Sequence, residues 1–216
     1  EEGWRGTAER IRAAGGEATG AVFEATEDES VAGLIARAVE AYGGLDGMLV
    51  NMADLSLHPK DTDAVDVPLA VFDRAVAVNL RGHLLCTRHA IPKMLKRGGG
   101  AIVYTGSSAG FMGRGVRVSY SVTKYALTAL MRHVASRWGK EGIRANLVSP
   151  GLVMSEKNRE HPEKAAVLAL GRSPRLGEPE DIAAMVAMLM SADGEWINGQ
   201  VVSVGRSSAL SRRPWR

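Results

Sequence analysis

The stretch "AIVYTG", residues 101–106, is a short apolar run that follows three consecutive glycines. Its length and its apolar character on both faces predict a strand with helices on both sides of its sheet. Further stretches of this kind occur at 17–23, 47–51, 144–150 and 200–204. Longer helical patterns separate them, at 29–42, 69–97, 119–141 and 179–190. This alternation predicts an α/β protein with a doubly wound parallel sheet, organised as one domain over residues 1–216.

Composition limits the class of protein. The 216 residues suffice for one domain with a substantial core, and the net charge is only +3. The single cysteine, Cys86, is typical of a reducing compartment, so we expect a cytoplasmic protein. No apolar run is long enough to span a bilayer, and no signal-peptide pattern opens the chain. The arginines of "SRRPWR" indicate a solvated terminus rather than a nucleic-acid site, because no basic stripe continues from them.

The stretch "SYSVTKYAL" places Tyr120 and Lys124 four residues apart, on one face of a predicted helix. A tyrosine with its reference pKa of about 10 is a poor base at neutral pH, but a neighbouring ammonium favours the phenolate. Such a pair can pass a proton to or from an alcohol or carbonyl oxygen. The spacing also arises by chance in many helices, where it has no chemical role.

Two other polar residues strengthen this interpretation. Ser107, in "YTGSSAG", lies just past the carboxyl end of the predicted strand 101–106, where its hydroxyl could bond a reacting oxygen. It could equally be a turn serine. Asn79, in "AVAVNLRG", is a polar amide inside an apolar helical run. It needs a partner there, unless it marks a local bend of the helix.

Taken in order, the motifs resemble those of the short-chain dehydrogenase/reductase family. The resemblance covers nearly the whole chain and rests on "GGLDGMLVNMAD", "AVNLRG", "YTGSSAG", "YSVTK", "NLVSPGLVMS", "LGEPEDIAAMVAMLMS" and "INGQVVSV". It implies a Rossmann-like fold and reversible hydride transfer between a nicotinamide, of NAD or NADP, and a small alcohol or carbonyl compound.

The resemblance implies a role for each candidate residue. Tyr120 corresponds to the general acid/base, and Lys124 to its partner and a ligand of the nicotinamide ribose. Ser107, rather than Ser108, corresponds to the group that orients the substrate oxygen. Asn79 corresponds to the residue that holds a water of the proton relay. Besides Tyr120 and Lys124, the implied cofactor-binding residues are Glu24, Ala25, Asn51, Ala53, Pro150, Gly151, Val153 and Ser155. No metal site is expected, because the histidines lack metal-ligand spacing.

The chain also departs from the family pattern. Residues 1–16 supply neither the first strand nor the glycine-rich turn that holds a pyrophosphate, and position 1 is not Met. We interpret this as a beginning that is missing or unrecorded. Removal of the two central strands of the family would leave 17–23 without its neighbour and expose an edge of 47–51. The alternative is therefore a truncated form that pairs its remaining strands differently.

Smaller departures lie at Met52 and Asp54, where the family usually has Asn and Gly, and in "VGRSS" near the end. They motivate a second hypothesis, a catalytically silent relative that persists as an oligomeric scaffold. The resemblance also implies a homodimer or homotetramer with helices 69–97 and 119–141 between subunits, and helix 179–190 with strand 200–204 could form a second interface. Trp196 is expected in the core or at a subunit interface rather than at a ligand.

Overall fold

The structure is a computed structural model that describes residues 2–161, 164–170 and 173–205. Its sheet contains four parallel strands in the order β1-β2-β3-β4. The strands are β1 (Gly47–Val50), β2 (Gly100–Thr105), β3 (Ile143–Pro150) and β4 (Val201–Val204). Because all four run in one direction, their carboxyl ends lie along one edge of the sheet. In an open α/β sheet this is the edge at which ligands bind.

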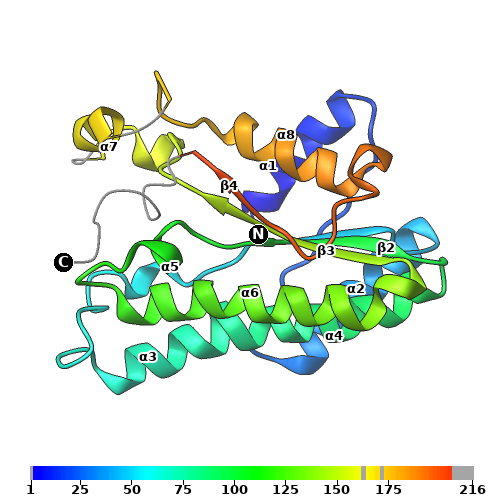
Figure 1. Ribbon diagram of the computed structural model, residues 1–216. Helices are drawn as coiled ribbons and strands as arrows, with labels where there is room; N and C mark the ends of the chain where they lie inside the picture. Colours follow the sequence, from blue (N-terminus) through cyan, green and yellow to red (C-terminus); the bar gives the residue numbers. More distant parts are fainter. Residues whose placement is uncertain (1, 162–163, 171–172, 206–216) are drawn as a thin grey trace.

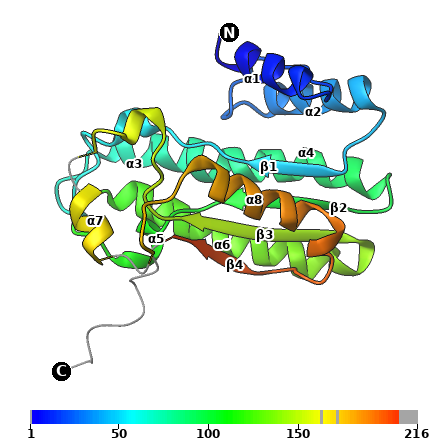
Figure 2. The ribbon, with the colours of Figure 1, turned by 90° about the horizontal axis from the view of Figure 1, so that it is seen from above.

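Helices cover both faces of the sheet. Helices α2, α4 and α6 lie on one side, and α8 lies on the other (Figure 1). Seen from above, α1 and α2 lie beyond the β1 edge of the sheet (Figure 2). The α-helices are α1 (Glu2–Ala13), α2 (Asp28–Tyr42), α3 (Leu69–Val76), α4 (Gly82–Leu95), α5 (Ala109–Met112), α6 (Val118–Trp138), α7 (Lys164–Leu170) and α8 (Pro179–Met190). Short helical turns are η1 (Leu55–Leu57), η2 (Ala77–Arg81), η3 (Gly139–Glu141), η4 (Glu156–Asn158) and η5 (Ala192–Gly194).

The central strand β2 explains the two-sided core. Alternate side chains of a strand point to opposite faces. Ile102 and Tyr104 therefore belong to the cluster formed with α4 and α6, whereas Val103 belongs to the cluster formed with α8. All three side chains are fully buried. The predicted doubly wound arrangement is thus confirmed.

The helix predicted over 69–97 is interrupted. Helix α3 continues into the π-helical segment η2 and then into α4, and Asn79 lies within η2. A π-helical turn inserts one extra residue per turn and is frequent at functional sites. The local distortion that we considered for Asn79 is therefore present, and Asn79 has partners as well.

The predicted strand at 17–23 is wrong. Within the described chain this segment pairs with no strand, and it runs extended between α1 and α2. An apolar segment becomes a strand only when a neighbour satisfies its backbone groups, and β1 pairs with β2 alone. The Trp4 ring of α1 packs so closely on Gly20 that a β-carbon at this position would clash with it. β1 is an edge strand, and its Leu49 is 43% exposed.

Two further findings concern the carboxyl-terminal half. The stretch 153–177, which lacks clear periodicity, contains the short helices η4 and α7. Trp196 does not lie in the core, because its side chain is 98% exposed. Among the described residues, no helix combines the length and apolar character needed to cross a membrane.

Candidate active site

Lys124 joins the carboxyl ends of β1 and β2. Its ammonium donates to the carbonyl oxygen of Thr105, at 2.8 Å, and to that of Met52, at 3.1 Å. The residue is only 2% exposed. Burial lowers the pKa of Lys124 to about 8, since the charged form loses hydration. The ammonium form still predominates at pH 7, so a positive charge lies at this edge of the sheet.

Asn79 links η2 to the same helix. Its carbonyl oxygen accepts from the backbone N–H of Asp54 at 2.9 Å, and its amide donates to the Thr123 hydroxyl at 3.4 Å. Thr123 in turn donates to the carbonyl oxygens of Ser119 and Tyr120. The side chain of Asn79 is therefore oriented from both ends, and its partner Thr123 directly precedes Lys124 in the sequence.

Tyr120 lies in the first turn of α6, where the backbone N–H groups lack partners within the helix. Asp61 supplies the missing acceptor, because its carboxylate accepts from the N–H groups of Ser119 at 3.0 Å and Tyr120 at 2.9 Å. Asp61 is 3% exposed. The ring of His58 meets that of Tyr120 edge to face, with centroids 4.9 Å apart and planes at 85°. Two residues that follow η1 thus contact Tyr120: Asp61 binds its backbone N–H, and His58 packs on its ring.

Ser107 follows β2 by two residues, and its hydroxyl accepts from the N–H of Ala109 at 3.2 Å. The N–H of Ser108 donates to the carbonyl oxygen of Pro150 at 3.0 Å, which ties this loop to the end of β3. Both serines are partly buried. The fold therefore brings Ser107, like Asn79, Tyr120 and Lys124, to the carboxyl edge.

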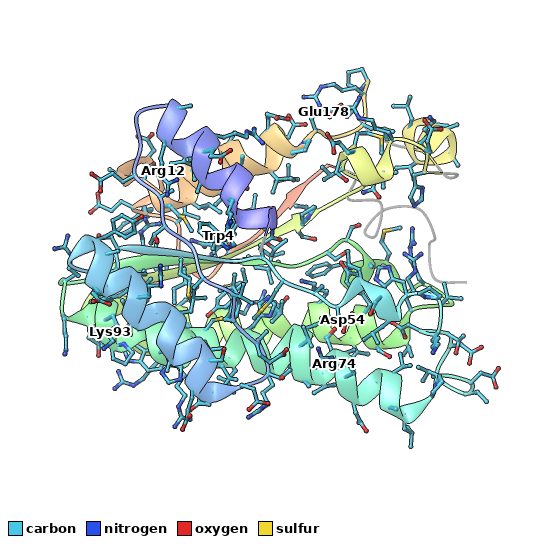
Figure 3. All side chains as sticks on the ribbon, turned by 180° about the vertical axis from the view of Figure 1, so that it is seen from behind. Trp4, Arg12, Asp54, Arg74, Lys93 and Glu178 are labelled. Carbon is cyan, nitrogen blue, oxygen red and sulfur yellow. The ribbon has the colours of Figure 1, made fainter. Side chains whose placement is uncertain are left out.

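Among the residues with an implied role in cofactor binding, Glu24 lies near Arg74. The guanidinium lies 3.3 Å from an Asp54 carboxylate oxygen and 3.9 Å from one of Glu24. Figure 3 labels Asp54 and Arg74, which lie near each other. A hydrogen bond from Thr26 holds the pKa of Glu24 below its usual value. Ala25 packs on the start of α4, where a β-carbon at Gly82 would lie 2.9 Å from the Ala25 carbonyl oxygen.

The remaining residues with an implied role in cofactor binding lie at the ends of β1 and β3. Asn51 is exposed and Ala53 is partly buried, both directly after β1. The N–H of Gly151 donates to the carbonyl oxygen of Val204 at 2.9 Å. Val153 forms an isolated parallel bridge with Gly177. Ser155 precedes η4 and accepts through its backbone carbonyl from Asn158.

His83 is a buried titratable residue behind this edge. It is fully buried and stacks on Tyr104, with ring centroids 6.3 Å apart. Burial, and secondarily the charge of Lys124, lowers the pKa of His83 to about 3. The imidazole is therefore neutral at physiological pH. The described residues contain no group of three or more His, Cys, Asp and Glu side chains that could hold a metal ion.

Comparison with known proteins identifies the family. A family profile described as enoyl-(acyl carrier protein) reductase matches residues 1–206. A probable short-chain type dehydrogenase/reductase of Bradyrhizobium diazoefficiens is 41% identical over 179 residues, which are 82% of this chain and 64% of that protein. This chain belongs to the short-chain dehydrogenase/reductase family. Levodione reductase of Leifsonia aquatica is 31% identical over 200 residues, which cover 87% of this chain and 74% of that protein.

Solved structures of short-chain dehydrogenases/reductases share the fold. The structure of 7α-hydroxysteroid dehydrogenase in complex with NADH and 7-oxo glycochenodeoxycholic acid matches with a TM-score of 0.85 and 27% identity, over 93% of this chain and 78% of that one. The levodione reductase structure matches with a TM-score of 0.82 and 29% identity, over 94% and 81% of the two chains. The Rossmann-like fold of this family member is thereby established.

Two departures of this short-chain dehydrogenase/reductase from its family pattern are explained by the backbone. Met52 contacts Lys124 through its carbonyl oxygen, and Asp54 contacts Asn79 through its N–H. Any residue supplies the carbonyl oxygen, and any residue except proline supplies the N–H, so neither bond requires the particular side chain present. The carboxylate of Asp54 instead binds Ser56 and Arg74. Of the third departure, Gly205 has a φ of 104°, and Arg206 and Ser207 lie outside the described residues.

Residue patterns alone missed Asp61, His58 and Arg74. Each contacts a site residue from a distant part of the sequence, and none belongs to a motif that we used. A local signal existed only for Asp61, which follows η1 and precedes a run of turns. An acidic residue of that kind is a common helix cap, but nothing local indicates which helix it caps.

Proposed function

We propose that this short-chain dehydrogenase/reductase is an NAD(P)(H)-dependent oxidoreductase acting on a small alcohol or ketone, with Tyr120 as general acid/base. The observation that carries the proposal is the buried ammonium of Lys124, held by two carbonyl oxygens one helical turn beyond Tyr120. Burying a charge costs free energy unless the charge is paired and hydrogen-bonded. A cation in this position stabilises a phenolate on the same face of the helix.

The donors of Lys124 suit a nicotinamide nucleotide. An ammonium has three N–H donors, and two are accepted by carbonyl oxygens of the described residues. The third suits a ribose hydroxyl. Residues just before α2 and at or after the ends of β1 and β3 would hold the rest of the nucleotide, namely Glu24, Ala25, Asn51, Ala53, Pro150, Gly151, Val153 and Ser155. When bound, the nicotinamide supplies or accepts the hydride.

Each polar residue of the site has one task in carbonyl reduction. The Ser107 hydroxyl donates to the substrate oxygen and orients it. The Tyr120 phenol transfers its proton to the same oxygen as negative charge develops there. Lys124 stabilises the phenolate that remains, and Asn79 holds the water through which the proton is replaced. Alcohol oxidation reverses these steps.

Relatives support this class of reaction. Their names describe a levodione reductase and a hydroxysteroid dehydrogenase bound to NADH and a 7-oxo compound. Oligomerisation through α4 and α6 also remains a proposal. Both helices expose apolar side chains, including Leu84 (50%), Val122 (48%) and Tyr125 (54%).

The decisive experiment is Tyr120→Phe, which removes one hydroxyl and keeps the ring. With NADH or NADPH and a panel of small ketones, we expect the turnover rate to fall by about a thousandfold, as for loss of a general acid. Tyr125→Phe, on the exposed face of the same helix, is the matched control and should retain activity. Near-normal turnover by the Tyr120 variant would contradict the mechanism.

Cofactor titration separates the enzyme from the alternative, a silent scaffold. Saturable quenching of tryptophan fluorescence by NADH or NADPH supports the enzyme. Its absence, with the fold intact by circular dichroism, supports the scaffold.

A further inference from the structure

We propose that His58 is a positioning residue that fixes the orientation of the Tyr120 side chain. The imidazole meets the phenol ring edge to face, with centroids 4.9 Å apart and planes at 85°. This is a favoured geometry for a pair of aromatic rings. His58 is partly buried, and it reaches Tyr120 from the loop that follows β1, not from the helix of Tyr120. The catalytic meaning of this contact rests on the proposed function.

The loop that carries His58 is attached to α6 at its far end. Besides the two bonds of the Asp61 carboxylate, the Asp61 carbonyl oxygen accepts from Arg117 at 3.0 Å, and that of Thr62 accepts from Val118 at 3.2 Å. Four hydrogen bonds thus join residues 61–62 to residues 117–120. Arg117 adopts a left-handed conformation, with φ 63°, to make this junction. The loop and the first turn of α6 therefore form one unit.

The near end of the loop is attached to Asn79. The N–H of Asp54 donates to the Asn79 side chain, and the Asp54 carboxylate accepts from the N–H of Ser56 at 3.2 Å. His58 is consequently held between two anchored positions, four residues after Asp54 and three before Asp61. An imidazole held in this way restrains the ring that it touches.

The restraint acts on the rotation that matters for chemistry. The hydroxyl of a tyrosine lies on the axis of its ring, so a turn about χ2 leaves the oxygen in place. A turn about χ1 moves the oxygen by several ångströms. A second ring packed against the phenol opposes the χ1 rotation and keeps the hydroxyl in one position. Orientation of this kind contributes directly to rate.

Helix α6 contains a matched control. His133 meets Trp138 edge to face at the opposite end of α6, with centroids 5.7 Å apart and planes at 87°. His133 is exposed and lies more than three helical turns from Tyr120. The variants His58→Ala and His133→Ala each remove one imidazole from an aromatic contact on the same helix. His58→Phe keeps an aromatic ring at the site, slightly larger than the imidazole, and removes the nitrogens.

The first measurement needs no activity. Tyrosine is isotope-labelled, and the Tyr120 ring signals are assigned by their loss in Tyr120→Phe. In His58→Ala we expect these signals to move and broaden, because a neighbouring ring is lost and the side chain gains freedom. They should remain nearly unchanged in His133→Ala. Unchanged Tyr120 signals in His58→Ala overturn the proposal, whether or not the protein is an oxidoreductase.

The second measurement is steady-state kinetics. We expect kcat of His58→Ala to fall about tenfold with KM unchanged, the size of effect that an aromatic pair accounts for, whereas His58→Phe retains most of kcat. An equal loss in His58→Phe overturns the positioning role, because the nitrogens would then be essential. If the wild-type protein turns over no substrate, the proposed function fails, and the tyrosine signals alone decide the role of His58.

Discussion

The two ends of the proposed site are built differently. At the end that contains Tyr120 and Lys124, polar side chains are buried and bonded mainly to the backbone. Exposed fractions are 2% for Lys124, 1% for Asn79 and 3% for Asp61. At the other end, the side chains of Glu24 and Arg74 are 52% and 45% exposed and meet through charge. Buried polar groups must be satisfied or they destabilise the fold, whereas exposed ion pairs contribute little. We therefore propose that the chemistry takes place at the end with Tyr120 and Lys124, where buried hydrogen bonds fix the side chains.

Among the substitutions that test this difference, Asp61→Ala is expected to lower the free energy of unfolding most. The change leaves the buried N–H of Ser119 and the partly buried N–H of Tyr120 without an acceptor, and we expect the free energy of unfolding to fall by about 3 kcal/mol. Urea denaturation measures it. Asp63→Ala is the matched control, because the carboxylate of Asp63 also accepts from two backbone N–H groups, at 2.9 and 3.0 Å, but is exposed. Equal losses in the two variants would mean that burial is not what distinguishes the ends.

A second contrast concerns pH. The pKa of His83 is lowered from 6.5 to about 3, so below pH 6.5 the unfolded chain binds a proton that the folded protein does not. Stability therefore falls as the pH drops from 6.5 toward 3. This one residue should remove about 2 kcal/mol of unfolding free energy between pH 7 and pH 5. Urea titrations of His83→Leu at both pH values should show a correspondingly smaller loss. An unchanged pH dependence would place the acid sensitivity elsewhere.

The smallest effect on stability is expected from Arg74→Gln. Since the ion pairs of Arg74 are largely exposed, the urea midpoint should remain close to that of the wild-type protein. The pKa of Asp54, which is lowered first by its bond to Ser56 and also by Arg74, should rise. Carboxylate NMR measures this change. Arg97→Gln, which removes an exposed pair with Asp46, should leave Asp54 unchanged. A large loss of stability in Arg74→Gln would contradict the contrast between the two ends.

The elements themselves were largely predictable. The four strands of the sheet and helix α8 form where apolar runs and glycines predicted them, within one or two residues. The segment 17–23 has the same apolar character but forms no strand, because a strand also requires a neighbour. The break in the helix at Asn79 was foreseen only as an alternative. The Asn79 amide in this segment bonds Thr123 of α6, 44 residues away, which no local pattern indicates.

The sequence by itself determined the period of each element, the family, and the spacing that puts Tyr120 and Lys124 on one helical face. Those features depend on residues a few positions apart. Only the tertiary structure decided that Asp61 caps the helix of Tyr120 across 59 residues, and that Lys124 reaches Met52 across 72. The contacts of His58 with Tyr120 and of Arg74 with Glu24 have the same origin. Such contacts depend on how strands and loops are arranged at the carboxyl edge of the sheet. A pattern of neighbouring residues does not determine that arrangement.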